Sequence, residues 1–349
     1  MMMDWTNHPA FDGHEDVVFL SDEALGLAGI IAVHSTALGP AAGGCRIWTY
    51  PDPKDALTDA LRLSRGMTYK NAMADLPLGG GKAVLYKMGA DRAACFAKFG
   101  EQVEAMGGRY ITAEDVGASV ADMRNIARRT SFVAGLPKEE GQAGGDPSPV
   151  TAMGVFVSIK ALLGGSVQGR TVAVQGVGSV GFNLCRLLAE EGAKLIVADV
   201  NEANLARATA LGAQAADVNT IDTLKADLFS PCALGAGLNE RTIPELGAPI
   251  VCGAANNQLA TEADGARLVA RGITYAPDYV VNAGGIINVS AEYLGEPADV
   301  VEGRVKAIAT RLMNVLEAAK RDGVPPHEAA DRMVREKIKA VGPHAARKD

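Results

Sequence analysis

The sequence predicts an α/β protein of two domains, and three of its features support this. Its length of 349 residues exceeds what one hydrophobic core usually organises. In the second half of the chain, short apolar runs alternate with helical patterns, which is typical of a doubly wound parallel sheet. A segment rich in glycine and proline, Gly135 to Pro149, separates the halves and is a candidate hinge. We expect a first domain over residues 1–140, with residues 323–349 packing back on it, and a second over residues 141–322.

Composition and charge exclude several classes of protein. The net charge is -7 and no basic block occurs, so we expect neither nucleic acid nor an anionic membrane as a partner. No apolar run approaches the roughly 18 residues that a membrane span requires. The stretch from Met1 to His14 lacks the basic and apolar regions of a secretory signal. We therefore expect a cytoplasmic protein that acts on small molecules.

The cysteines and histidines give no sign of a disulfide framework or a metal site. The chain has five cysteines, an odd number, and none forms a C-x-x-C pair, so we expect reduced and mostly buried thiols. The five histidines are scattered without the spacing of metal ligands. We predict no protein-bound metal.

The first domain mixes strands and helices. Apolar runs at Val17–Leu20 and Ala28–Val33 predict strands. Residues Pro51 to Ala74 predict a helix, since Asp52 suits the N-cap and Pro53 the first helical position. Its buried face is predicted from apolar residues at helical spacing, namely Ala56, Leu57, Ala60 and Leu61.

The second domain opens with a predicted helix, Val150–Leu163, and a long amphipathic helix is predicted at Val300–Asp322. The strands predicted between them are Thr171–Gln175, Lys194–Asp199, Asp227–Phe229, Ile250–Cys252 and Ile273–Tyr275.

A glycine motif follows the first of these strands and precedes a predicted helix at Phe182–Glu191. It has the pattern G-x-G-x-x-G, in the strand and helix context of a dinucleotide site. Gly176 permits the tight turn, Gly178 lets the backbone approach a pyrophosphate, and Gly181 lets helix and strand pack closely. The residues expected to surround the phosphates with backbone N–H groups are Val177, Ser179 and Val180.

Asp199 ends the next strand, 23 residues after Gly176 (199 − 176), near the distance of about 20 expected for the acid that binds the ribose. A carboxylate there accepts hydrogen bonds from the 2′-hydroxyl and repels a 2′-phosphate. Val200 and Asn201 follow it, so no arginine is available for such a phosphate. The motif therefore predicts a Rossmann domain that binds NAD rather than NADP.

Two lysines of the first domain suggest chemistry. Lys70 lies near the end of the predicted helix, and Lys82 follows the glycine-rich loop expected at Leu78–Gly81. The phosphate-loop pattern G-x-x-x-x-G-K-[ST] fails, because Leu76 occupies its first glycine position and Ala83 follows the lysine. We interpret the glycines as making room for a substrate at Lys82. For either lysine alone, an ordinary solvated side chain is the simpler explanation.

Several segments resemble the glutamate/leucine/phenylalanine/valine dehydrogenase family, and most closely its leucine and phenylalanine branches. They occur in the family's order and cover nearly the whole chain. The segments are Gly39–Arg46, Met67–Asn71, Leu78–Lys82, Ile111–Gly117, Pro147–Ala152, Gly253–Gln258, Ala276–Tyr279 and Asn282–Gly285. Cys45 departs from the family's usual threonine, and we expect it to be a buried structural thiol.

The resemblance implies a homo-oligomeric enzyme for the reversible, NAD-dependent oxidative deamination of an L-amino acid to a 2-oxo acid and ammonium. It also implies an active site in the cleft between a substrate and oligomerisation domain and the Rossmann domain. Lys70 should hold the substrate carboxylate, Lys82 should activate the water that attacks the imine, and Asp115 should carry protons to and from the amine. Further substrate contacts are implied for Gly44, Ala42, Ala113, Asn282, Ile286 and Val289. Further cofactor contacts are implied for Thr151, Val200, Ala233 and Asn256.

The side-chain pocket is predicted to be apolar. Family members that act on glutamate carry a lysine and a serine where this chain has Ala42 and Val289. Burying a substrate carboxylate there would cost several kcal/mol. We expect leucine, valine or isoleucine as the substrate. Phenylalanine is the alternative, because the small Ala42 leaves space for a phenyl ring. Ile286, in contrast, would crowd such a ring.

Two other functions fit the sequence less well. A catalytically silent NAD-binding sensor would need the glycine motif but not Lys70, Lys82 and Asp115 together. A hydroxy acid dehydrogenase commonly uses a histidine base, and no histidine of this chain falls in a motif segment.

Overall fold

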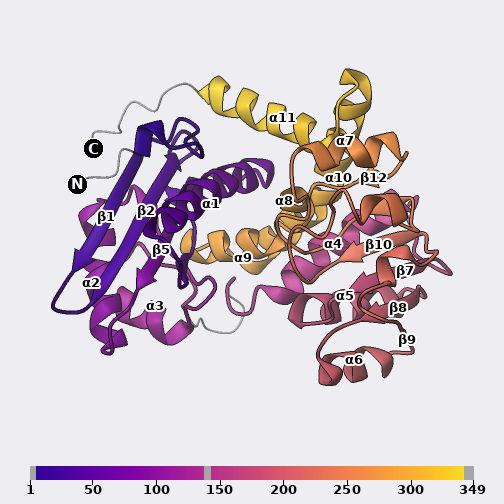
Figure 1. Ribbon diagram of the computed structural model, residues 1–349, viewed down its shortest axis with the longest axis horizontal. Helices are drawn as coiled ribbons and strands as arrows, with labels where there is room; N and C mark the ends of the chain where they lie inside the picture. Colours follow the sequence, from indigo (N-terminus) through magenta and orange to yellow (C-terminus); the bar gives the residue numbers. More distant parts are fainter. Residues whose placement is uncertain (1–4, 137–142, 342–349) are drawn as a thin grey trace. The chain divides into compact units, whose positions relative to one another are not determined.

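The computed structural model describes residues 5–136 and 143–341, which form two compact units (Figure 1). The described part of the first unit comprises residues 5–136, 143–145, 289–298 and 334–341. The second unit comprises residues 146–288 and 299–333. Residues 137–142 of the candidate hinge lie outside the described residues.

The unit boundaries differ from the predicted ones near the C-terminus. The sequence predicted a return to the first domain at residue 323, but residues 323–333 belong to the second unit. There Ala329 packs against Ala318 and Ala319, and the Tyr279 hydroxyl donates to Asp331 Oδ1 at 2.6 Å. The return of residues 289–298 to the first unit was not foreseen.

The first unit is built on a mixed six-stranded sheet. Its order is β1-β2-β5-β3-β6, and β4 also pairs with β5. β1, β2 and β5 are antiparallel neighbours, whereas β3 and β4 run parallel to β5. The strands are β1 (Asp16–Asp22), β2 (Leu27–Ser35), β3 (Ala41–Ala42), β4 (Cys45–Ile47), β5 (Gly79–Lys87) and β6 (Tyr110–Ile111).

Helices cover both faces of this sheet, because alternate residues of β2 point to opposite sides. Ile30 and Ala32 pack with Leu57 and Leu61 of α1 (Pro53–Met73). The opposite face of the sheet packs with Phe96 of α2 and with α3. Asp52 caps α1 by accepting from Lys54 N at 2.8 Å, as predicted. The bounds of the other helices are α2 (Arg92–Ala105), α3 (Val120–Ala127) and the 3₁₀ turn η1 (Trp5–Asn7).

The second unit contains a parallel sheet of order β12-β11-β10-β7-β8-β9. The chain leaves β7 in one direction for β8 and β9, and then places β10 on the other side of β7. This is the doubly wound Rossmann order, in which ligands bind where the direction reverses. Its strands are β7 (Thr171–Gln175), β8 (Lys194–Ala198), β9 (Gln214–Ala215), β10 (Leu228–Pro231), β11 (Ile250–Val251) and β12 (Thr274–Tyr275).

Helices separate most of these strands, so the predicted alternation and α/β class are confirmed. The helices that lie between strands are α5 (Ser179–Glu190), α6 (Glu202–Thr209) and α7 (Ala263–Ala270). Helix α4 (Ser148–Leu162) precedes β7, whereas α8 (Asp278–Val281) and α10 (Ala298–Asp322) follow β12. α9 (Gly284–Tyr293) and α11 (Pro326–Val341) each cross a boundary between the units. The 3₁₀ turns of the second unit are η2 (Ile221–Thr223) and η3 (Ile243–Glu245). No described helix is both long enough and apolar enough to cross a membrane.

The cysteines are free thiols and four of the five are buried. Cys45 is completely buried in the core between the first sheet and α2, and burial raises the pKa of its thiol. Within the residues that the structure describes, no group of three His, Cys, Asp or Glu side chains is arranged to hold a metal ion.

Two histidines are buried together beneath α1. His34 Nδ1 lies 2.8 Å from Thr68 Oγ1, and His14 Nε2 lies 2.9 Å from Leu61 O. Their ring centroids are 4.8 Å apart. Burial, with a contribution from neighbouring His14, lowers the pKa of His34 to about 4 from 6.5.

This depressed pKa predicts a pH-dependent stability of the first unit. The unfolded chain takes up a proton on His34 near pH 6.5 and the folded chain near pH 4, so stability is fully present above pH 6.5 and falls as the pH falls through this window. At one pKa unit per 1.36 kcal/mol, the loss reaches about 3 kcal/mol. Urea unfolding of the His34→Gln variant should therefore show a shallower dependence on pH between 4 and 6.5 than the wild type. An equal pH dependence of stability in the two proteins would contradict its assignment to His34.

Candidate active site

Lys82 lies in the middle of β5 and its side chain is 6% exposed. Its Nζ is 2.9 Å from Asp115 Oδ2. Burial alone would raise the pKa of Asp115, but the Lys82 ammonium and the Arg46 guanidinium outweigh it and lower that pKa. The structure thus brings the two predicted catalytic residues into contact and keeps the carboxylate ionised.

The backbone beside Gly44 explains how Asp115 reaches Lys82. Cys45 N donates to Ala113 O at 2.8 Å, which ties the segment after β6 to β4. A Cβ added at Gly44 would lie 2.4 Å from Glu114 O and 2.9 Å from the Asp115 Cβ. Only glycine permits this approach, so Gly44 supports the site through the backbone.

Lys70 lies in the last turn of α1 and is half-buried. The end of α1 is held against the start of β5, since Asn71 Nδ2 donates to Gly79 O at 2.5 Å. From the C-terminal helix α11, Arg335 donates to the Tyr69 hydroxyl and Lys337 pairs with Asp75. These contacts fix the turn that carries Lys70.

The glycines before Lys82 lie in a strand and not in the predicted loop. The expected loop is the beginning of β5, and a Cβ at Gly80 would lie 2.1 Å from Thr68 N of α1. A Cβ at Gly79 would lie 1.9 Å from Ser35 O, and one at Gly81 would meet the Tyr110 ring. The glycines therefore let α1 and neighbouring strands pack against β5, and their predicted place in a loop is wrong. That they also make room for a substrate at Lys82 stays a prediction.

The residues predicted for the side-chain pocket are small or half-buried. Ala42 of β3 pairs with Gly80 and Ile111 and is 5% exposed. Ala113 follows β6 and is half-buried. Ile286 and Val289 are half-buried and three residues apart on α9, so they share one face of that helix.

The glycine motif of the second unit has the predicted turn. Gly176 has a φ of +89°, and a Cβ there would lie 2.7 Å from the Cβ of Ala233, which follows β10. A Cβ at Gly181 would lie 2.0 Å from Gly176 O, whereas one at Gly178 would meet nothing within 4 Å. The open space therefore occurs at the glycine that the motif assigns to the pyrophosphate, where α5 begins.

Asp199 is fixed beside this turn. Its Oδ2 accepts from Val177 N and its Oδ1 from Asn201 N, both at 2.7 Å. Val200 is 85% exposed. The carboxylate and an apolar side chain thus lie at the carboxyl end of β8, next to the glycine turn.

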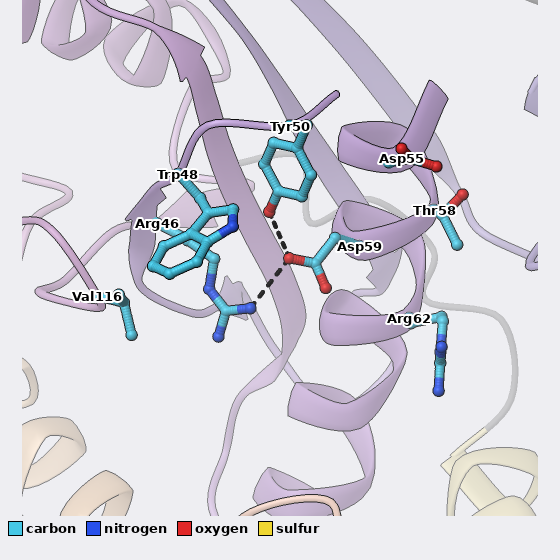
Figure 2. A pocket seen from close by; sticks show the side chains of 8 residues that line it. All are labelled: Arg46, Trp48, Tyr50, Asp55, Thr58, Asp59, Arg62 and Val116. Carbon is cyan, nitrogen blue, oxygen red and sulfur yellow. Dashed lines mark hydrogen bonds and ion pairs between the residues drawn. The ribbon is translucent and has the colours of Figure 1, made fainter. Parts of the chain in front are cut away.

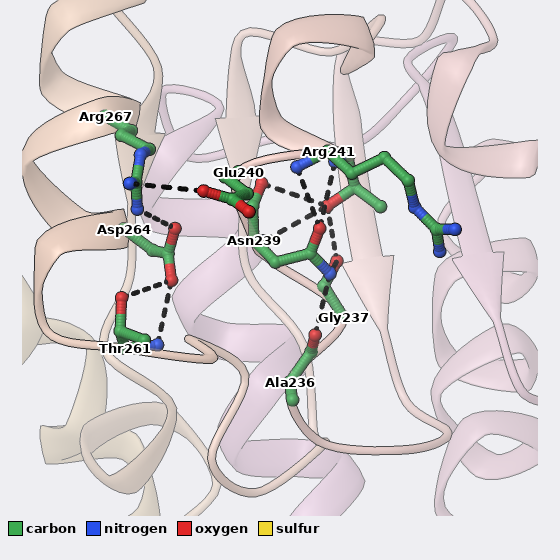
Figure 3. A network of polar contacts seen from close by, with 9 residues as sticks. Ala236, Gly237, Asn239, Glu240, Arg241, Thr261, Asp264 and Arg267 are labelled. Carbon is green, nitrogen blue, oxygen red and sulfur yellow. Dashed lines mark hydrogen bonds and ion pairs between the residues drawn. The ribbon is translucent and has the colours of Figure 1, made fainter.

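The loop that carries Ala233 is held by a network of polar contacts (Figure 3). Asn239 Nδ2 donates to Ala236 O at 3.0 Å, and Thr242 Oγ1 donates to Gly237 O at 2.6 Å. Glu240 faces Arg267, which also pairs with Asp264. The loop is therefore shaped by its own side chains.

Asn282 is 5% exposed and donates from Nδ2 to Asn256 Oδ1 at 2.9 Å and to Ala254 O at 3.1 Å. Its Oδ1 is buried without a hydrogen-bond partner among the described residues. Thr151 Oγ1 donates to Pro147 O at 2.9 Å. Because a buried acceptor without a partner is costly, Asn282 has the chemistry to accept a hydrogen bond from a ligand.

The sequence analysis missed Arg46, although it lies in one of the segments that carry the resemblance. Its Nε donates to Asp115 Oδ2 at 3.0 Å and its Nη1 to Asp59 Oδ2 at 2.9 Å. Figure 2 shows Asp59 also accepting from the Tyr50 hydroxyl, at the edge of a cavity of about 510 Å³. No single-residue pattern distinguishes such an arginine, because its partners are distant in sequence.

The second and third glycines of the second-unit motif predict opposite phenotypes. Gly178→Ala should leave the unfolding temperature unchanged while weakening dinucleotide binding about tenfold or more, since its Cβ enters only open space. Gly181→Ala should destabilise the fold, because its Cβ meets a backbone oxygen. Calorimetric titration and thermal unfolding of both variants measure this. Normal dinucleotide affinity in Gly178→Ala would exclude its role.

Comparisons with known proteins identify the family of the chain. A family model described as Glu/Leu/Phe/Val dehydrogenase, dimerisation domain, matches residues 14–132, and another described as Glutamate/Leucine/Phenylalanine/Valine dehydrogenase matches residues 197–342. Leucine dehydrogenase of Bacillus subtilis (strain 168) is 48% identical, covering 94% of this chain and 92% of the relative. Valine dehydrogenase of Streptomyces virginiae is 44% identical, covering 95% of each. The crystal structure of L-tryptophan dehydrogenase from Nostoc punctiforme matches with a TM-score of 0.84 at 41% identity, over 94% of this chain and 97% of that one. The chain belongs to the glutamate/leucine/phenylalanine/valine dehydrogenase family.

Proposed function

We propose that this protein catalyses the reversible, NAD-dependent oxidative deamination of a branched-chain L-amino acid, with leucine, valine or isoleucine as substrate. The observation that carries the proposal is the 2.9 Å contact between buried Lys82 and Asp115. A silent binding protein would have no need of this pair, and the similar proteins described above are dehydrogenases.

Three residues of the first unit, Lys70, Lys82 and Asp115, each have a role in the proposed reaction. The Lys70 ammonium holds the substrate carboxylate, and the Asp115 carboxylate accepts a proton from the substrate ammonium. Bound NAD would supply the acceptor for the hydride that leaves Cα, and the substrate would become a protonated imine. Once Lys82 has released its proton to solvent, its neutral amine takes a proton from the water that attacks the imine carbon, and Asp115 returns a proton to the departing amine. Close positioning of these groups supplies much of the rate enhancement.

The second unit fits the cofactor. Gly178 leaves space for a pyrophosphate at the start of α5, and Asp199 suits a ribose with a free 2′-hydroxyl. The uncompensated Asn282 Oδ1 suits an amide or amine donor, and Thr151, Asn256, Val200 and Ala233 are proposed to complete the contacts. A 2′-phosphate would face the Asp199 carboxylate, which supports NAD over NADP.

The proposed pocket residues favour an apolar side chain. No charged side chain stands at Ala42, Ala113, Ile286 or Val289, so a substrate carboxylate there would lack a partner. The presence of leucine and valine dehydrogenases among the similar proteins supports an aliphatic substrate for this chain. Phenylalanine remains the second candidate because Ala42 is small. We also propose a homo-oligomer, since the matched family model of residues 14–132 is a dimerisation domain.

A substrate panel tests this function. NADH formation should be greatest with leucine, valine or isoleucine, lower with phenylalanine and methionine, and negligible with glutamate or with NADP in place of NAD. Differences of one methylene should change kcat/KM only about 10- to 200-fold. A phenylalanine maximum would favour the second candidate. Inactivity with every amino acid, while NAD still binds, would overturn the proposed reaction.

Replacement of the catalytic lysine tests the mechanism. Lys82→Ala should lower kcat at least about 100-fold, because a general base is lost, while NAD binding is retained. Lys87→Ala is the matched control, since Lys87 is exposed at the end of the same strand. A Lys82→Ala enzyme as active as this control would refute the assigned role.

A further inference from the structure

We propose that Arg46 is a positioning residue, which acts on the reaction by holding the Asp115 carboxylate in place. The inference rests on the proposed function of Asp115 and adds a residue to it. Arg46 and Lys82 both contact Oδ2 of Asp115, at 3.0 and 2.9 Å. Oδ1 is therefore the oxygen that remains for the amine of a substrate.

The guanidinium of Arg46 is itself fixed on its other side. Nη1 donates to Asp59 Oδ2, and that oxygen also accepts from the Tyr50 hydroxyl. Asp59 lies on α1, whereas Asp115 follows β6. The planar fork of an arginine can bridge two carboxylates in this way, which the single ammonium of a lysine does less well.

Charge balance gives Arg46 a second role. Lys82, Arg46, Asp115 and Asp59 together carry no net charge when all are ionised. Side chains of Arg46, Asp59 and Asp115 are each less than a third exposed, so their interactions are only partly screened by water. Loss of Arg46 would leave one negative charge in excess and would free Asp115 to rotate around its contact with Lys82.

The cavity beside Arg46 makes this role open to chemical rescue. Arg46 lines it together with Trp48, Asp59 and Arg62, and Trp48 is 56% exposed. Removing the Arg46 side chain would extend the cavity to Asp115. A small planar cation in solution can then occupy the vacated position.

The first test compares Arg46→Ala with the matched control Arg62→Ala. Arg62 lines the same cavity and has no ion pair among the described residues. We expect Arg46→Ala to lower kcat about 100-fold, with little change in the KM for NAD, as for a displaced catalytic group. Millimolar guanidinium should restore at least about tenfold of the loss, whereas urea, which has the same shape without the charge, should not. Arg62→Ala should keep wild-type kcat. Equal kcat in the two variants, or a loss that guanidinium does not relieve, would overturn the inference.

A double-variant cycle separates positioning from a merely structural role. If Arg46 acts through Asp115, then Arg46→Ala should lower kcat no further in an Asp115→Asn background. If the two substitutions lowered kcat by factors that multiply in the double variant, Arg46 would act independently of Asp115. This result would overturn the inference.

A crystal structure of the Arg46→Ala variant provides a readout that needs no activity. We expect the Asp115 side chain to leave its wild-type rotamer beside Lys82. An unchanged carboxylate would overturn the inference even if the wild-type protein oxidised none of the amino acids, an outcome that would separately refute the proposed reaction.

Discussion

The first unit depends on backbone segments that approach one another with no Cβ between them. At Gly43 an added Cβ would lie 1.8 Å from Gly81 O, and at Gly80 it would lie 2.1 Å from Thr68 N. These approaches bring β4, β5 and the last turns of α1 within reach of each other. Lys82 meets Asp115 only because Gly44 allows the segment after β6 to lie against β4. The glycines are therefore structural requirements of the site even where no ligand touches them.

Removal of one charge should be costly here, because Lys82 is buried and its charged neighbours are half-buried. Removing one partner of a buried ion pair leaves the other charge uncompensated, at a cost of about 3–5 kcal/mol. Here the Asp115 carboxylate has two cationic partners, and Arg46 has two anionic ones. The arrangement spreads the cost of burial over four ionised groups, and it holds the carboxylate in one orientation before a substrate arrives. Such preorganisation is what an acid–base group needs.

In the second unit, too, glycines let backbone segments approach one another closely. The order of its strands reverses between β7 and β10, and this places the Gly176 turn beside Ala233. The turn, the open space at Gly178 and the Asp199 carboxylate lie at the carboxyl ends of adjacent strands. Topology, three glycines and one acid therefore assemble the site that we propose for the dinucleotide.

The sequence by itself determined whatever depends on near neighbours in the chain. The strand, glycine motif and helix at residues 171–190, the Asp52 cap and the alternation of the second unit were all predicted, because dihedral preferences, hydrogen-bonding caps and hydrophobic periodicity act over a few residues. The resemblance supplied the roles of Lys70, Lys82 and Asp115. Only the tertiary structure decided what depends on distant segments: that Gly79–Gly81 serve packing, that residues 289–298 return to the first unit, and that Arg46 links Asp115 to Asp59. Arg46 and Asp115 are 69 positions apart, and Gly135 and Glu292 are 157 apart. No local pattern encodes which side chains the folded backbone will bring together.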